Sequence, residues 1–116
     1  MVTQYASGKK AEIMESALRI FKQKGLEKAS VRDIMKDAGY GIGTFYLYYA
    51  DKKDLKEQIV LKKSIDIIIN AEEHCTGIDP VERYISFVDY IIDYLIANPF
   101  ELELLRDNIT WALYTE

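Results

Sequence analysis

Apolar residues recur at intervals of three and four along most of this 116-residue chain, and the pattern breaks where Gly or Pro occurs. This spacing is the period of an amphipathic helix and not that of a strand. The chain has only six Gly and two Pro, without a tract of either, which is too few turn residues for an all-β protein. The sequence therefore predicts an all-α fold of six helices joined by short connections.

Capping residues indicate where these helices begin and end. Ser30 with an acid three residues later is typical of a helix start, and so is Asp79 followed by Pro80. Gly25 and Gly39 are typical of residues that follow a helix. The expected helices cover about 9–24, 31–38, 42–48, 52–73 and 81–97, followed by a last one after Pro99.

The helix expected over 81–97 is apolar on nearly every side. A helix of this kind is usually enclosed by neighbouring helices. We therefore expect it to be buried.

Charge is distributed unevenly along the chain. Residues 1–56 have eleven Lys and Arg against seven Asp and Glu, a net charge of +4, whereas residues 57–116 have four against twelve, a net charge of −8. A basic first half and an acidic second half indicate that only the first could approach a polyanion such as DNA. The alternative is that the asymmetry has no function.

Several classes of protein are disfavoured by composition. The single cysteine, Cys75, excludes an internal disulfide and a cysteine-based metal site, which is typical of a cytoplasmic protein. The longest uncharged run, residues 38–50, is too short to span a membrane, and residues 1–5 do not resemble a signal peptide. Because the single His74 has no candidate catalytic partner and no Gly-rich phosphate loop follows a strand, we expect no enzyme activity, metal or cofactor.

Two short helices joined by a Gly-containing turn, over 31–38 and 42–48, form a helix-turn-helix candidate. Phe45 and Tyr49 are four residues apart and can face inward, which leaves Thr44, Tyr46 and Tyr48 on other faces. Their hydroxyls can reach DNA phosphates, and their apolar atoms can contact thymine methyl groups in a major groove. The alternative is an aromatic-rich core helix.

Residues 13–55 resemble the DNA-binding head of TetR-type (TetR/AcrR) transcriptional regulators. The matching residues are Ala17-Leu18-Arg19-Ile20-Phe21 with Gly25, Ser30-Val31-Arg32-Asp33-Ile34, Ala38-Gly39, and Gly43-Thr44-Phe45-Tyr46 followed by Tyr49 and Lys52. The resemblance implies a three-helix, homeodomain-like head with a helix-turn-helix, a long connecting helix and part of a helical regulatory domain. It thus divides the chain into a DNA-binding domain over 1–51 and a ligand-binding and dimerisation domain over 52–116.

The resemblance also implies which residues contact DNA. Thr44 matches a recognition-helix Thr that contacts DNA. Tyr46 matches a Tyr that touches the phosphate backbone, and Tyr48 occupies another position that faces DNA. Lys52 matches a Lys that meets a phosphate at the start of the fourth helix. Ser30 and Arg32 lie at the start of the second helix, which approaches the backbone on the flank.

The chain departs from the family pattern at three positions. Tyr40 and Gly41 replace a common Val-Ser pair, so the third helix loses an N-cap hydroxyl and one possible phosphate contact. Leu47 replaces a residue that is often polar or basic. The recognition helix therefore contains none of the Arg, Lys, Asn or Gln side chains best suited to bidentate base readout, and the bases it reads stay open.

By the same resemblance, the protein is a ligand-responsive repressor whose full-length form is a homodimer on a palindromic operator. The second half would then begin a domain that encloses a small effector, and 116 residues would not complete it. Candidate effector-binding aromatics are Tyr84, Phe87, Tyr90, Tyr94 and Trp111, for which ordinary packing is the alternative. The competing hypothesis for the whole chain is a helical protein–protein interaction module whose helix-turn-helix head does not bind DNA.

Overall fold

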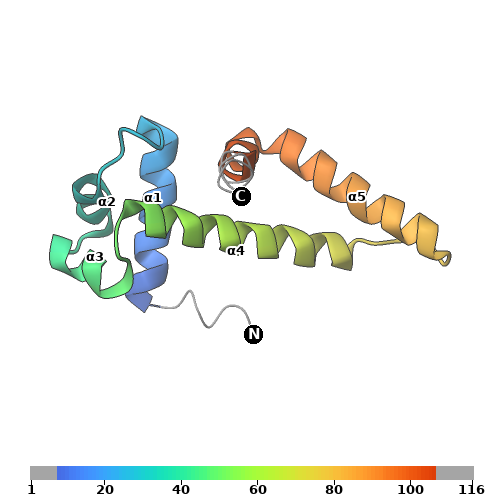
Figure 1. Ribbon diagram of the computed structural model, residues 1–116, viewed down its shortest axis with the longest axis horizontal. Coiled ribbons are helices and arrows are strands. Elements are labelled where there is room, and N and C mark those ends of the chain that lie inside the picture. The colour runs from blue at the N-terminus through green and yellow to red at the C-terminus, as the bar shows by residue number, and fades with distance from the viewer. Residues whose placement is uncertain (1–7, 107–116) are drawn as a thin grey trace, which may run out of the picture. The chain divides into compact units, whose positions relative to one another are not determined.

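The computed structural model describes residues 8–106, and every regular element in this range is a helix (Figure 1). The all-α fold expected from the sequence is confirmed, and the limits of the helices agree to within a residue. The elements are α1 (Gly8–Lys24), α2 (Val31–Ala38), α3 (Ile42–Tyr48), α4 (Lys52–Glu73) and α5 (Pro80–Ala97), with residues 99–106 also helical. Trp111 and the rest of the last expected helix lie outside the described residues.

The chain divides into two compact units, residues 1–57 and 58–116, and α4 continues across the boundary between them. We call the described part of the first unit, residues 8–57, the head. The expected functional division into 1–51 and 52–116 stays a prediction.

Within the head, α1 packs against α2 and α2 against α3 (Figure 1). The head's core is built from the buried face of each helix, together with Tyr49 and the first turn of α4. These buried residues include Ile13, Ala17 and Phe21 of α1, Ile34 and Met35 of α2, Phe45 of α3, Tyr49, and Leu55 of α4.

Local caps set the limits of α2. The Ser30 hydroxyl accepts a hydrogen bond from the Asp33 amide at 3.0 Å, and the Asp33 carboxylate accepts one from the Ser30 amide at 3.1 Å. This reciprocal pair is a capping box, which satisfies amides that the first turn leaves unpaired. Gly39 ends the helix with φ of 84°, a left-handed conformation that Gly adopts without strain.

Caps also fix the starts of α4 and α5. The Asp51 carboxylate accepts from the Asp54 amide at 2.8 Å, and the Asp54 carboxylate accepts from the Ala50 amide at 2.8 Å. At α5, the Asp79 carboxylate accepts from the Val81 amide at 3.0 Å. The helix start expected at Asp79 is thus confirmed, and Asp51 caps α4 in the same way.

The expectation that α5 is enclosed is wrong for the described residues, because none of its residues is buried. One side of the helix is half-buried, whereas the other exposes Val81, Tyr84, Ile85, Ile92 and Ile96. A helix that is apolar around its circumference needs partners on several sides, and residues 8–106 cover only one. None of the helices within 8–106 is long and apolar enough to cross a membrane.

Candidate nucleic-acid interface

The recognition helix α3 is anchored by one buried row of side chains. Phe45 and Tyr49 are 0% and 2% exposed, and their ring centroids lie 5.4 Å apart. The Tyr49 hydroxyl donates to the Lys10 main-chain carbonyl of α1 at 3.2 Å. The inward orientation expected of both aromatics is confirmed.

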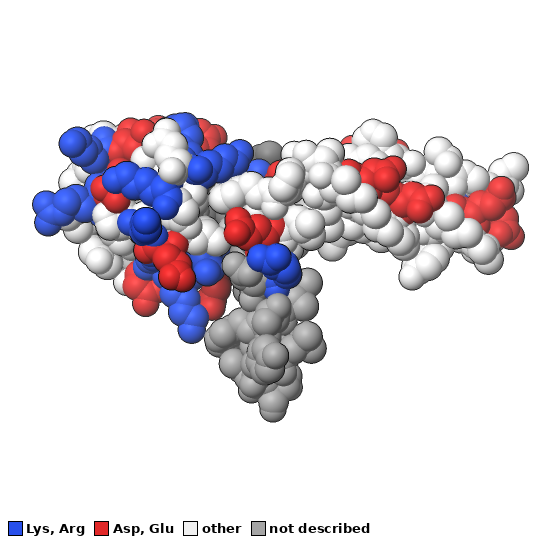
Figure 2. Space-filling view, turned by 90° about the horizontal axis from the view of Figure 1, so that it is seen from above, with Lys and Arg blue, Asp and Glu red and all other residues white. Residues whose placement is uncertain are grey.

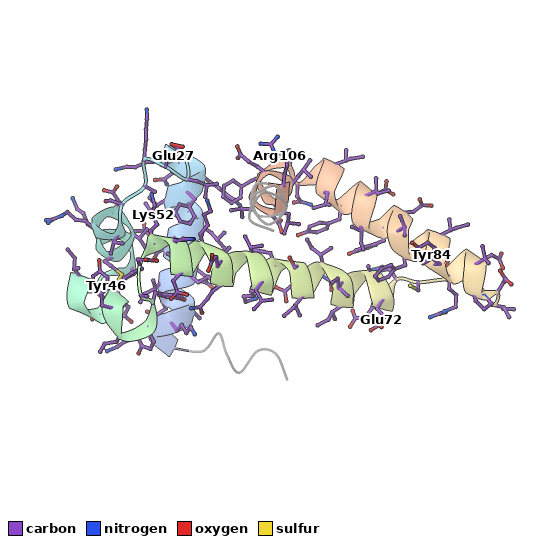
Figure 3. All side chains as sticks on the ribbon, in the orientation of Figure 1. Glu27, Tyr46, Lys52, Glu72, Tyr84 and Arg106 are labelled. Atoms are coloured by element: carbon purple, nitrogen blue, oxygen red, sulfur yellow. The ribbon has the colours of Figure 1, made fainter. Side chains whose placement is uncertain are left out.

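The remaining faces of α3 point out of the head. Tyr46 is 55% exposed, Leu47 77% and Tyr48 36%, while Thr44 is half-buried. Tyr46, labelled in Figure 3, lies on α3 at the outside of the head, and its ring meets Phe45 edge-on at 5.0 Å. The exposure of Tyr46, Leu47 and Tyr48 excludes the alternative that α3 is a core helix on all sides.

The start of α2 presents the other two candidate residues. Ser30 and Arg32 are both exposed. The Ser30 hydroxyl oxygen accepts the cap hydrogen bond from the Asp33 amide, which fixes this side chain at the first turn of α2. The backbone and side-chain hydrogen bonds from Ser30, and the Lys24 ammonium 3.1 Å away, lower the pKa of Asp33.

The turn before α3 is held by a contact that the sequence did not indicate. Gly41 supplies no side-chain cap for α3, as expected from the loss of Ser at this position. Instead, the Tyr40 hydroxyl donates to the Glu12 carboxylate of α1, which raises the pKa of Tyr40. The Lys9 ammonium lies 5.4 Å from the centroid of the Tyr40 ring, within the range of a cation–π contact. Tyr40 thus ties the turn to α1.

Lys52 is engaged inside the head. Its ammonium donates to the main-chain carbonyls of Leu26, Glu27 and Ala29 at 2.9, 3.1 and 2.9 Å. These three residues belong to the connection between α1 and α2, and Lys52 stands at the start of α4 (Figure 3). An ammonium has three N–H donors and no acceptor, so this geometry occupies all of them.

A second contact links α1 to α2. The Arg19 guanidinium donates to the Asp37 carboxylate at 2.8 and 3.1 Å, and also to the Ser16 hydroxyl at 3.1 Å. The hydrogen bond from Arg19 lowers the pKa of Asp37. Because water reaches both charged side chains, the pair orients α1 and α2 more than it stabilises the head.

In the second unit, only some of the aromatic candidates come together. The Tyr90 ring stacks on His74 at 4.7 Å and lies 6.4 Å from the Tyr94 ring. The Tyr94 hydroxyl lies 2.9 Å from both carboxylate oxygens of Glu101. Burial, together with the hydrogen bond to Glu101, raises the pKa of Tyr94 to about 12.

The other candidates are more scattered. Phe87 is half-buried, Tyr84 is 69% exposed, and Trp111 lies outside the described residues. Tyr84 is labelled on α5 in Figure 3. Within residues 8–106, the acidic, His and Cys side chains form no group of three that could hold a metal ion.

Comparison with known proteins agrees with this geometry. The sequence profile described as "Bacterial regulatory proteins, tetR family" matches residues 13–59. The HTH-type transcriptional regulator YvdT of Bacillus subtilis is 49% identical over 49 residues, which are 42% of this chain and 25% of YvdT. An HTH-type transcriptional regulator of Staphylococcus aureus strain USA300 is 36% identical over 106 residues, covering 87% of this chain and 55% of that protein. The chain thus spans between a quarter and about half of these relatives' lengths.

Solved structures share the fold. A TetR-family transcriptional regulator from Haemophilus influenzae superposes with a TM-score of 0.61 at 26% identity, over 84% of this chain and 54% of that one. The fatty acid degradation regulator FadR from Bacillus halodurans superposes with a TM-score of 0.69 at 24% identity, over 86% and 53%. Residues 13–59 thus match the tetR family of bacterial regulatory proteins in sequence, and the helices of this chain match those of a solved TetR-family regulator in space.

Proposed function

We propose that this protein is a sequence-specific DNA-binding transcriptional regulator whose head places α3 in the major groove of a duplex. The observation that carries the proposal is the division of residues 42–49 into a buried row, Phe45 with Tyr49, and exposed faces that bear Tyr46 and Tyr48, with Thr44 half-buried. A recognition helix needs this arrangement, because one side must hold it in the domain while the other meets the base edges.

The distribution of charged residues also supports DNA binding by the head. The head contains most of the Lys and Arg residues of the chain, and most of the blue side chains in Figure 2 lie over it, with acidic residues interspersed. Cationic side chains that neutralise phosphates supply most of the sequence-independent affinity for DNA. The acidic second unit has no comparable attraction for a polyanion.

The candidate residues take different roles in this proposal. Ser30 and Arg32 donate to phosphates on the flank of the site, and Tyr46 and Tyr48 reach the backbone beside the groove. Thr44 contacts base edges or the adjacent phosphate. For Lys52 we replace the phosphate contact implied by the family with a positioning role, because its three N–H donors are used by the connection between α1 and α2.

The second unit would regulate the head. We propose that it contributes to binding a small effector, and that two copies in the full-length protein hold two heads on a palindrome with half-sites about 34–36 Å apart. Tyr90 and Tyr94 are the strongest effector candidates, because their rings come together and Glu101 offers a polar partner beside them. An effector then acts by binding the DNA-competent and DNA-incompetent states with different affinities.

The proposal is tested by titrating the protein against a mixed-sequence duplex at several salt concentrations. We expect affinity to fall steeply with salt, and Arg32→Gln to reduce the slope of log affinity against log salt by about one. Arg83→Gln, in the acidic second unit, is the matched control and should leave the slope unchanged. Affinity without salt dependence, or none at all, would favour a protein–protein interaction module.

A further inference from the structure

The outermost ridge of α3 is made by Gly43 and Leu47. Leu47 follows the buried Phe45 by two residues, which is about 200° around a helix, so it lies opposite the anchored side. It is 77% exposed, more than either Tyr46 or Tyr48. Gly43, four residues earlier, stands in the same row, and a Cβ there would meet nothing within 4 Å.

The side chains of α3 limit what this ridge can recognise. Bidentate recognition of guanine or adenine uses Arg, Lys, Asn or Gln, and cytosine is read by Asp or Glu. None of these occurs among the seven residues of α3, Ile42–Tyr48. Leu47, the most exposed of the large hydrophobic side chains of α3, has only apolar atoms to offer.

One base edge matches such a side chain. The thymine 5-methyl is the apolar group that a base pair presents in the major groove, and apolar side chains read it by contact. We infer that α3 distinguishes its half-site chiefly through thymine methyl groups, with Leu47 as the specificity-determining contact. This inference rests on the proposed DNA-binding function and adds the chemical class of site that the head selects.

The absence of a side chain at Gly43 is part of the same geometry. Because Gly43 adds no bulk one turn before Leu47, the ridge can approach the floor of the groove along its length. Tyr46 and Tyr48 then flank the ridge, where their hydroxyls reach outward to the phosphates. The apolar ridge and its polar flanks therefore match a groove that has methyl groups on its floor and phosphates along its edges.

The test compares duplexes that differ by one methyl group. The full chain first selects duplexes from a random pool, and each thymine in the enriched site is then replaced by deoxyuridine, which removes only the methyl. In a second series, each thymine–adenine pair is replaced by cytosine–guanine or 5-methylcytosine–guanine, which separates the methyl group from the shape of A·T sequences. Both series are repeated with Leu47→Ala, and with Leu61→Ala as the matched control, an exposed leucine of the second unit.

We expect at least one thymine at which deoxyuridine weakens binding about three- to tenfold, and at which 5-methylcytosine binds more tightly than cytosine by a similar factor. In Leu47→Ala, both differences should fall below about twofold, whereas Leu61→Ala should keep them in full. If replacing each thymine by deoxyuridine leaves the affinity for the selected site unchanged, the inference is overturned and the proposed function stays intact. An undiminished methyl effect in Leu47→Ala would overturn the role of Leu47, and failure to enrich any duplex would refute the proposed function itself.

Discussion

Lys52→Met should destabilise the head, because it removes the ammonium that three main-chain carbonyls share. Met keeps a straight apolar chain of similar length, so the change tests the charged group more than the packing of the stem. The three carbonyls belong to Leu26, Glu27 and Ala29, between α1 and α2. Without the ammonium, this connection and the first turn of α4 lose these three hydrogen bonds.

The size of the effect follows from the surroundings of these bonds. A hydrogen bond to a charged group contributes about 1.5–3 kcal/mol, whereas ordering a lysine side chain costs up to about 2 kcal/mol. Of the three residues that accept, only Ala29 is buried, so water can replace part of the loss at Leu26 and Glu27. We therefore expect a loss of about 2–3 kcal/mol in the free energy of opening the head.

Native-state hydrogen exchange of the α2 amides measures this opening directly. The expected loss corresponds to exchange about 30- to 150-fold faster than in the unaltered protein. Lys28→Met is the matched control, since Lys28 lies in the same connection with an exposed side chain, and it should leave exchange nearly unchanged.

Lys52→Arg separates the positioning role from a phosphate contact. Arg keeps the positive charge, but its planar guanidinium cannot direct three N–H groups onto three converging carbonyls. We expect Lys52→Arg to lose most of the stability that Lys52→Met loses. Lys52 instead contacts a phosphate if both variants exchange like the unaltered protein while Lys52→Met alone lowers the salt slope of DNA binding by about one.

Three further predictions concern the caps and the buried hydroxyls. The pKa of Asp33 is lowered from 3.8, so the stabilising effect of its carboxylate is complete above pH 3.8 and is lost as the pH falls through the lowered value. Acid unfolding, followed by circular dichroism, should therefore begin at higher pH in Ser30→Ala. An unchanged unfolding profile would argue against the capping box. Gly39→Ala should destabilise the head by about 1–2 kcal/mol because φ there is 84°, and urea unfolding with an unchanged midpoint would contradict this. Burial raises the pKa of Tyr49 and Tyr94 to about 12, so both hydroxyls stabilise the fold fully below pH 10 and lose this effect as the pH rises through about 12. Alkaline titration followed by tyrosine absorbance should show one late-titrating tyrosine fewer in Tyr94→Phe than in the unaltered protein. Identical titration curves would disprove the raised pKa of Tyr94.

The helix limits could be predicted because their determinants are local. Ser30 and Asp33 form a capping box within four residues, and the carboxylate of Asp79 caps the two residues that follow Pro80. The two faces of α3 also follow from local spacing, since the positions of Phe45 and Tyr49 one turn apart decide what points outward.

The internal ties of the head could not be predicted from such patterns. Lys52 meets carbonyls that lie 23 to 26 residues earlier in the chain, and Tyr40 meets Glu12 across 28 residues. Nothing in the spacing of these residues indicates that they come together, because the contacts depend on how the helices pack. The exposure of α5 was mispredicted for a related reason, since an apolar surface shows that a helix needs partners without showing which residues supply them.

The central claim, that the head reads DNA sequence through α3, is tested most directly by selection from a random duplex pool with the unaltered chain and with Thr44→Ala. We predict that the unaltered chain enriches a short motif, bound more tightly than pool DNA at the same salt concentration, and that Thr44→Ala enriches a different or more degenerate motif. If the unaltered chain enriches no motif over successive rounds, or if Thr44→Ala and substitutions at Leu47 leave the enriched motif unchanged, α3 does not read the sequence and the account is wrong.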